Sequence, residues 1–96
     1  MNYIQRLAEI THKELSDRRA YCINNSNDKI IAGNAACEYF LRPHKNGGWR
    51  VGFQELGRGI VYEDYHFKTE REACIKFIEI SEDDYHLSKY LSEFAN

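Results

Sequence analysis

The first part of the chain carries a stripe of mainly apolar residues at helical spacing. The members of this stripe recur at spacings of three and four, and they are Ile4, Leu7, Ala8, Thr11 and Leu15. Asn2 stands directly before the stripe, where its side chain can accept a hydrogen bond from the first helical turn. The pattern predicts an amphipathic helix that begins after Asn2 and ends near residues 17–19.

Two short apolar runs with strand character follow this helix. Residues 21–23 alternate in polarity, and residues 29–32 include two β-branched isoleucines before Gly33. The run between them, Asn24-Asn25-Ser26-Asn27-Asp28, consists of small polar residues that are typical of a turn. We therefore expect two strands joined by a tight connection.

A second pair of runs predicts a β-hairpin. Residues 37–41 and 49–53 flank Asn46-Gly47-Gly48, and glycine permits the positive φ angles that reverse a chain. Pro43 removes a backbone donor and disfavours helical angles before it, which argues against a long helix here. Trp49, Val51 and Phe53 occupy alternate positions, so we expect their side chains to share one face.

Residues 60–62 and 65–67 are rich in β-branched and aromatic side chains, which favours a further strand or two. Glu63 and Asp64 separate these two runs, and we expect a bulge or a turn there. Gly57 and Gly59 flank Arg58 in the preceding connection. Glycine lets backbone amides approach a phosphate, but no Lys-Ser or Lys-Thr follows as a nucleotide-binding loop requires, so we interpret this segment as a loop.

The last third of the chain predicts two helices. Thr69 and Glu72 form a capping-box pattern, and the apolar residues behind it are Ala73, Cys74, Phe77, Ile78 and Ile80. Ser81 and Asp84 repeat the pattern, which predicts a second helix with its own cap and a buried side made by Leu87, Leu91 and Phe94.

This order of elements predicts the fold class. We expect an α+β fold with an N-terminal helix, a three- to five-stranded antiparallel sheet and two C-terminal helices packed on the sheet. The chain has 96 residues, 43% of them hydrophobic and 14% aromatic, which suits one folded domain over residues 1–96. Cys22, Cys37 and Cys74 are odd in number and widely spaced, so they are interpreted as small core residues.

The sequence also limits the compartment and the cofactors. The N-terminal residues lack the apolar run of a signal peptide, and no apolar stretch is long enough to span a bilayer, so we expect a cytoplasmic protein with no membrane partner. No motif for a cofactor is present. The four histidines are far apart in the sequence without metal-ligand spacing, so we expect no metal site.

Acidic residues are concentrated in the last third of the chain. Residues 1–62 hold nine basic and six acidic residues, whereas residues 63–96 hold four and nine, so the two parts carry +3 and −5. The simplest interpretation is a set of solvated helix faces. The alternative is an acidic docking surface for a basic partner.

Two functions that involve nucleic acid are further alternatives. His44 lies beside Lys45 and near Arg42 and Arg50, which is the chemistry of a metal-independent ribonuclease, although a basic hairpin tip is the simpler interpretation. The α-β-β-β-α order is that of double-stranded RNA-binding domains. Those modules place lysines at the start of the final helix, where this chain has Thr69-Glu70-Arg71-Glu72, and we therefore expect no nucleic-acid partner.

The central segment resembles small immunity proteins of bacterial contact-dependent growth-inhibition (CDI) and polymorphic-toxin systems. Their pattern has a Trp-x-Val strand, a Glu-Arg-Gly-like turn, a Phe, and a Thr/Ser-Glu-x-Glu-Ala-Cys helix. The matching residues here are Trp49, Val51, Glu55-Leu56-Gly57-Arg58-Gly59, Phe67, Thr69-Glu70-Arg71-Glu72-Ala73-Cys74 and Phe77. The turn differs in reading Glu-Leu-Gly-Arg-Gly, and most of the shared residues have core character.

The resemblance implies a toxin-neutralising immunity protein without catalytic activity. Its partner would be a cognate toxin, the C-terminal toxin domain of a large secreted or surface effector, often a nuclease, whose active site or substrate groove it blocks. The alternatives are a generic protein-interaction module, and a small nucleic-acid-binding domain or metal-independent ribonuclease. The sequence assigns no oligomeric state.

Charge complementarity suggests which residues would contact such a toxin. A nuclease groove is basic, so carboxylates would orient the complex and exposed tyrosines would supply affinity. The predicted toxin-binding residues are Glu63, Asp64, Glu79, Glu82, Asp83, Asp84, Tyr62, Tyr65, Tyr85 and Tyr90.

Overall fold

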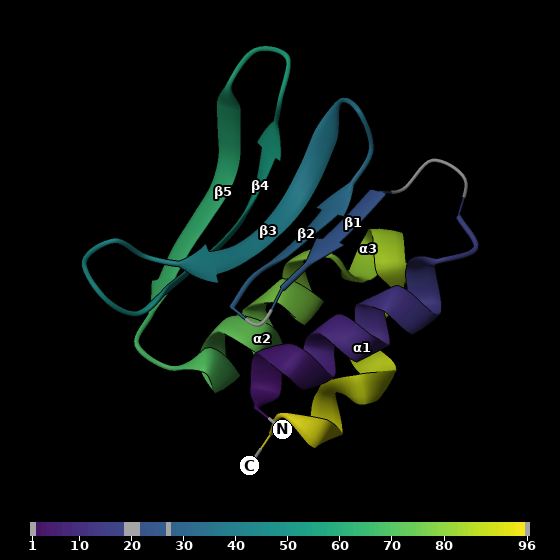
Figure 1. Cartoon of the computed structure of the whole chain (residues 1–96), viewed down its shortest axis with the longest axis vertical. Coiled ribbons are helices and arrows are strands. Elements are labelled where there is room, and N and C mark those ends of the chain that lie inside the picture. The colour runs from purple at the N-terminus through teal and green to yellow at the C-terminus, as the bar shows by residue number, and fades with distance from the viewer. Residues whose placement is uncertain (1, 19–21, 27, 96) are drawn as a thin grey trace.

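The computed structural model describes residues 2–18, 22–26 and 28–95 and confirms the expected α+β architecture (Figure 1). The N-terminal helix is α1 (Tyr3–Leu15). Five strands follow, β1 (Cys22–Asn25), β2 (Ile30–Gly33), β3 (Cys37–Pro43), β4 (Trp49–Glu55) and β5 (Ile60–Phe67). The chain closes with the helices α2 (Glu70–Ile80) and α3 (Glu82–Tyr85) and the 3₁₀-helix η1 (Ser88–Glu93).

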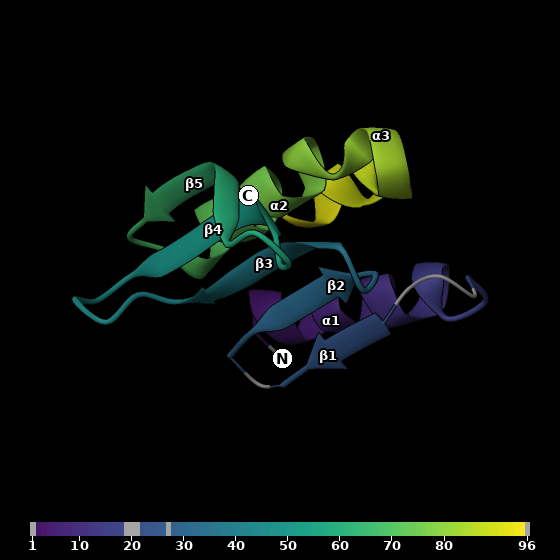
Figure 2. The ribbon, with the colours of Figure 1, turned by 90° about the horizontal axis from the view of Figure 1, so that it is seen from above.

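The strands form one antiparallel sheet in the order β1-β2-β3-β4-β5. Each strand therefore pairs with its neighbour in sequence, as Figure 2 shows from above. The hairpin predicted for residues 37–41 and 49–53 is confirmed, because Leu41 pairs with Val51 and Tyr39 with Phe53. All helical segments lie on the same side of the sheet (Figure 1), which leaves the other side uncovered.

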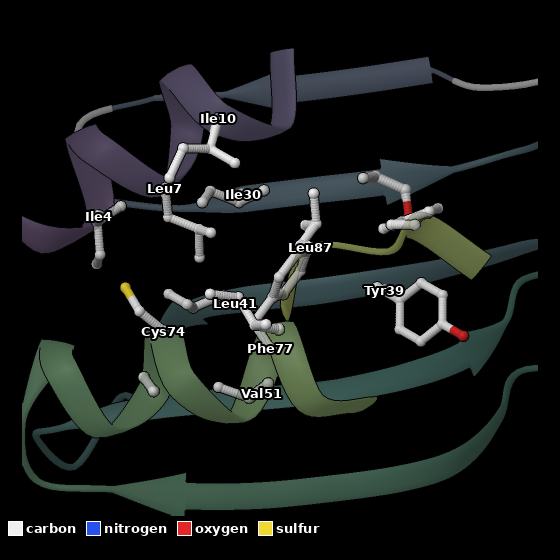
Figure 3. Packing of buried hydrophobic residues seen from close by; sticks show 14 of the residues in the cluster. Ile4, Leu7, Ile10, Ile30, Tyr39, Leu41, Val51, Cys74, Phe77 and Leu87 are labelled. Carbon is white, nitrogen blue, oxygen red and sulfur yellow. The ribbon is translucent and has the colours of Figure 1, made fainter. Parts of the chain in front are cut away.

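The hydrophobic core lies between the sheet and the helices. Leu41 and Val51 from neighbouring strands face Cys74 and Phe77 of α2, as Figure 3 shows, and all four side chains are fully buried. α1 packs from the other end of the sheet, where Ile4 and Leu7 of the predicted stripe are buried near Ile30 together with Ile10, which the predicted stripe did not include. Each such side chain contributes about 1.5–3 kcal/mol through burial, so this layer supplies most of the favourable free energy.

Tyr39 joins the sheet to the C-terminal helices. Its ring centroid lies 4.5 Å from that of Phe53, 5.2 Å from that of Tyr85 and 6.4 Å from that of Phe77. Its hydroxyl donates a hydrogen bond of 2.5 Å to Asp84 Oδ2. A tyrosine suits this place because the ring is buried while the hydroxyl meets a polar partner.

Two of the three predicted helix caps are confirmed. The Asn2 side chain accepts from Gln5 N–H at 2.7 Å, and Gln5 Oε1 accepts from Asn2 N–H at 3.2 Å. The Thr69 hydroxyl accepts from Glu72 N–H at 3.2 Å and donates to the Glu72 carboxylate at 2.9 Å. Here the carboxylate reaches the cap hydroxyl rather than the cap N–H, which is a variant of the capping box.

The cap predicted at Ser81 is wrong, although a new helix does begin after it. Ser81 is fully buried, and its hydroxyl donates backward to the Phe77 carbonyl at 2.6 Å instead of accepting from Asp84. α3 then ends after four residues at His86, whose φ of 56° is left-handed. Leu87 and Phe94 are buried as predicted, but Leu91 is only partly buried.

No helix among residues 2–18, 22–26 and 28–95 has both the length and the hydrophobicity needed to cross a membrane.

β5 is a single strand with a bulge, which lies at Tyr62 rather than at Glu63 and Asp64, where it was expected. Phe53 pairs with Glu63 and Gln54 pairs with Val61, so Tyr62 is an extra residue without a partner on β4. Such a bulge shifts the register by one residue and changes which side chains face the core. After the bulge Tyr65 lies opposite Val51 on the helix side, and His66 lies opposite Arg50 on the uncovered side.

The cysteines that the structure describes are not in a disulfide. Cys74 is fully buried, as expected for a core residue, and burial raises the pKa of its thiol to about 12. Cys37 is half-buried and free. The placement of the Cys22 side chain lies outside the described part of the structure.

One aromatic side chain is buried on the uncovered side of the sheet. Phe40 alternates with Tyr39 and Leu41, so it points away from the helices, yet it is 0% exposed. The guanidinium groups of Arg42 and Arg50 cover its ring at 4.8 and 5.3 Å from the centroid. Gly52 on β4 makes room for the ring, since a Cβ at that position would lie 2.6 Å from Phe40 Cζ.

We expect Gly52→Ala to destabilise the fold strongly. The added methyl group would lie 2.1 Å from the Glu63 carbonyl oxygen as well as 2.6 Å from Phe40 Cζ, so strand pairing or the ring must shift. Overpacking of this kind costs about 1–3 kcal/mol of unfolding free energy, which urea denaturation measures. Gly57→Ala is the matched control, because its added methyl meets nothing within 4 Å and should leave stability nearly unchanged. Equal midpoints for the two variants would contradict the packing described for Phe40.

Candidate functional site

The acidic residues predicted to bind a toxin do not form one surface. Glu63 lies on the helix side of β5, where its carboxylate accepts from the Tyr65 hydroxyl at 2.9 Å. Asp64 lies on the opposite side and forms a two-point ion pair with Arg50, with distances of 3.0 Å to Nε and 2.8 Å to Nη2. This hydrogen bonding lowers the pKa of Asp64 and raises the pKa of Arg50. The charge of Asp64 is therefore largely neutralised within the chain.

Two further carboxylates have structural contacts. Glu82 accepts from Ser88 N–H at 2.8 Å and so satisfies a donor at the start of η1, and these hydrogen bonds lower the pKa of Glu82. Asp84 accepts from the Tyr39 hydroxyl, and its carbonyl accepts from Arg18 at 2.6 Å. Both residues hold the C-terminal segment in place, although each retains part of its negative charge.

Glu79 and Asp83 are the remaining predicted carboxylates. Both are exposed, and neither forms a salt bridge with another residue in the described ranges. They lie near the α2–α3 junction and are free to contact a partner. They are the part of the predicted acidic surface that the structure leaves available.

The four predicted tyrosines differ in how far they are exposed. Tyr85 is only 2% exposed and donates to the Ala32 carbonyl at 2.9 Å, so its proposed role as a surface anchor is wrong and it belongs to the core. Tyr90 is half-buried and donates to Glu14 at 2.7 Å. Tyr65 is half-buried beneath Lys76, whose Nζ lies 4.3 Å from the ring centroid. Tyr62 alone among the four is exposed, at 52%.

Tyr62 belongs to a patch of exposed apolar side chains that the sequence analysis did not recognise. The other members are Leu56, Ile60 and Val61, which are 45%, 37% and 44% exposed. They lie on the same β4–β5 hairpin but not on one face of it, because Ile60 pairs with Glu55 on the helix side and Val61 pairs with Gln54 on the uncovered side. We call these four residues the hairpin patch. Apolar residues exposed singly are ordinary, but several gathered on one hairpin indicate a contact surface.

Polar contacts hold the base of the hairpin patch. Glu55 forms an ion pair with Arg58 and accepts from the Tyr62 hydroxyl at 3.1 Å. The hydrogen bond from Arg58 lowers the pKa of Glu55, and the hydrogen bond to Glu55 raises the pKa of Tyr62. The Tyr62 ring lies 6.0 Å from that of Phe53, which ties the exposed tyrosine to the edge of the core. The tyrosine is thus partly fixed in position before any partner binds.

A second group of side chains gathers at the other end of β4 and β5. His44, in the turn after β3, lies against His66 of β5 with ring centroids 4.6 Å apart. The two rings line a hollow of about 440 Å³ together with Pro43, Lys45, Arg50 and Asp64. The sequence pattern indicated His44, Lys45, Arg42 and Arg50 but not His66, because the position of His66 depends on strand register. We call His44, Lys45, Arg50 and His66 the basic cluster.

Local backbone geometry places the His44 ring. Its Nδ1 accepts from Asn46 N–H at 3.0 Å, which leaves the proton of the neutral ring on Nε2. Gly47 and Gly48 have φ values of 97° and 77°, so the turn requires residues without a Cβ there. No group of three metal-ligating side chains occurs in the described part of the chain.

The chain was also compared with known proteins. No protein-family model, no curated protein and no solved structure matches it. Functional interpretation therefore depends on the residues themselves.

The Arg50–Asp64 pair predicts a specific pH dependence. Because the pKa of Asp64 is lowered in the folded state, the pair stabilises the fold at neutral pH, and this contribution is lost as pH falls through the folded pKa. In Arg50→Met the pKa of Asp64 should rise toward its ordinary value of about 3.9, as followed by a carboxyl ¹³C NMR titration. The unfolding free energy of the variant should then fall less steeply below about pH 4. In Lys13→Met, the control, the pKa of Asp64 should not move; an unchanged pKa in Arg50→Met would contradict the pairing.

Proposed function

We propose that this protein is an immunity protein that binds a cognate toxin domain, such as a nuclease, and blocks its active site or substrate groove without catalysing a reaction. The observation that carries the proposal is the hairpin patch, an apolar surface with an exposed tyrosine on a small domain. The segment from Trp49 to Phe77 resembles immunity proteins, and this resemblance supports the proposal independently. A folded domain with such a patch on an exposed hairpin is suited to binding another protein.

The hairpin patch has the composition of an interface centre. Tyr62 and the neighbouring Arg58 are of the residue types most enriched at binding hot spots, and Leu56 and Ile60 add exposed apolar area on the same hairpin. Arg58 is 71% exposed in its side chain although it is paired with Glu55, so it can also contact a partner. We therefore place the principal toxin contact on the β4–β5 hairpin.

The free carboxylates provide a second, electrostatic contribution. Glu79 and Asp83 are exposed and unpaired among the described residues, so they can attract a basic nuclease groove and speed association. Their effect should depend on ionic strength, whereas the contribution of the hairpin patch should not. This difference separates the two surfaces experimentally.

We expect Tyr62→Ala to weaken toxin binding by about 30-fold, since loss of a hot-spot side chain costs about 2 kcal/mol. The measurement is titration calorimetry against the toxin domain encoded beside the gene of this protein, with toxin activity followed in the same samples. Tyr62 is exposed, so its substitution should change the unfolding free energy by no more than about 0.5 kcal/mol. Lys13→Ala on the exposed side of α1 is the control and should bind like the unmodified protein.

A Glu79→Gln/Asp83→Asn variant tests the alternative placement of the contact. Under our proposal it reduces the association rate at low salt but retains tight binding at high salt. Full affinity in Tyr62→Ala together with loss of affinity in the acidic variant would move the contact to the α2–α3 junction. Absence of binding by the unmodified protein to the neighbouring toxin would overturn the proposed function itself.

A further inference from the structure

The basic cluster gathers nitrogen-bearing side chains around one hollow, and Arg42 lies beside it on the neighbouring strand. Arg42, Arg50 and His66 lie directly opposite one another on three adjacent strands, because Arg42 pairs with Arg50 and Arg50 pairs with His66. The like charges of Arg42 and Arg50 lie directly opposite each other, and such a pair destabilises a sheet. Asp64 neutralises Arg50, but Arg42 and Lys45 form no salt bridge within the described residues. A ligand with negative charge would offset the remaining repulsion.

Hydrogen-bond donors from three segments of the chain line the hollow at this place. His44 and Lys45 come from the β3–β4 turn, Arg50 from β4 and His66 from β5, and Asp64 is the one carboxylate in the lining. His66 Nε2 is 3.5 Å from Asp64 Oδ1, so this carboxylate lies close to the second imidazole as well as to Arg50. Lys68 lies beside His66 and the glycine turn in an adjoining hollow. Side-chain donors from several segments, with Lys45 and Arg50 as the charged ones, match the several acceptor oxygens of a phosphate.

We propose that the basic cluster binds a phosphate group, as a phosphate monoester or as a phosphodiester of a nucleic-acid strand. The expectation of no nucleic-acid partner depended on the acidic start of α2, which lies on the opposite side of the sheet from this cluster. The proposed site is also separate from the hairpin patch. It lies toward the other end of β4 and β5, about 13 Å along the strand for the four residues from Tyr62 to His66 and farther from the other members of the patch.

The geometry suits binding rather than strand cleavage. In-line phosphoryl transfer requires an acid and a base on opposite sides of the phosphorus atom, with the phosphate between them. The rings of His44 and His66 are 4.6 Å apart at their centroids, which leaves no space for a phosphate between them. Both imidazoles can instead contact the same phosphate from one side, together with Lys45.

The experiment is an NMR titration of the ¹⁵N-labelled protein at constant ionic strength. The probes are inorganic phosphate, uridine 5′-monophosphate and an octauridylate strand. We expect saturable shifts confined to residues 44–50 and 64–68, and dissociation constants at least about tenfold higher in a Lys45→Ala/His66→Gln variant. The matched control is Lys13→Ala/His12→Gln, which removes the same residue types from exposed positions of α1 and should bind as the unmodified protein does.

The three probes distinguish the sources of the phosphate. Equal affinity for all three assigns a single phosphate group as the ligand. Tighter binding of octauridylate, with an affinity that falls steeply with added salt, assigns a nucleic-acid strand. The proposal is overturned if no probe gives saturable shifts at the basic cluster, or if the two double variants lose affinity equally. Either result leaves the toxin-binding proposal untouched, because that proposal depends on the hairpin patch.

Discussion

The packing of every helical segment on the same side of the sheet is the interaction on which the rest of this structure depends. It buries Leu41, Val51 and their neighbours against α1 and α2, and it leaves the other side of the strands without a cover. Phe40 points to that uncovered side and still avoids water, because Arg42 and Arg50 lie over its ring and Gly52 gives the ring space. The arginines thus have a structural reason to be adjacent. The adjacent positions of Arg42 and Arg50 also add positive potential to the basic cluster. One arrangement of side chains therefore accounts for both the burial of Phe40 and the candidate site.

In the acidic part of the sequence, by contrast, internal contacts reduce the charge that the surface presents. Its carboxylates are close in the chain, but folding assigns several of them to separate tasks. Asp64 pairs with Arg50, Glu82 accepts at the start of η1, and Asp84 receives the hydroxyl of Tyr39. A count of charges along a segment therefore overstates the field that the folded molecule presents. The residues best placed to contact a partner are therefore those that these ion pairs and hydrogen bonds do not involve, above all the hairpin patch.

Periodicity and capping chemistry were sufficient to predict most of the fold. The stripe from Ile4 to Leu15 indicated α1, Thr69 and Glu72 indicated the start of α2, and the glycines at positions 47 and 48 indicated the β3–β4 turn. These signals are local, and local signals can be seen in a sequence. Ser81 resembled a cap equally well, but burial at the end of α2 directed its hydroxyl to a carbonyl instead.

The candidate sites depended on register, which local patterns do not determine. The extra residue at Tyr62 places His66, rather than Tyr65, opposite Arg50. Without that bulge the second imidazole would lie on the helix side, away from His44. The hairpin patch was missed for a related reason, since Leu56, Ile60 and Val61 have the composition of core residues and only the structure shows their exposure.

The nearest-neighbour order of the strands has a consequence for how the chain folds. Connections between successive strands contain only three to five residues, so each hairpin closes with a small loss of chain entropy. The contact between α1 and α2 is different, because it joins segments that are separated by the entire sheet in the sequence. Loop closure over that distance costs more chain entropy than the closure of any one hairpin. The meander is therefore able to assemble from the middle of the chain outward, with the N-terminal helix docking last.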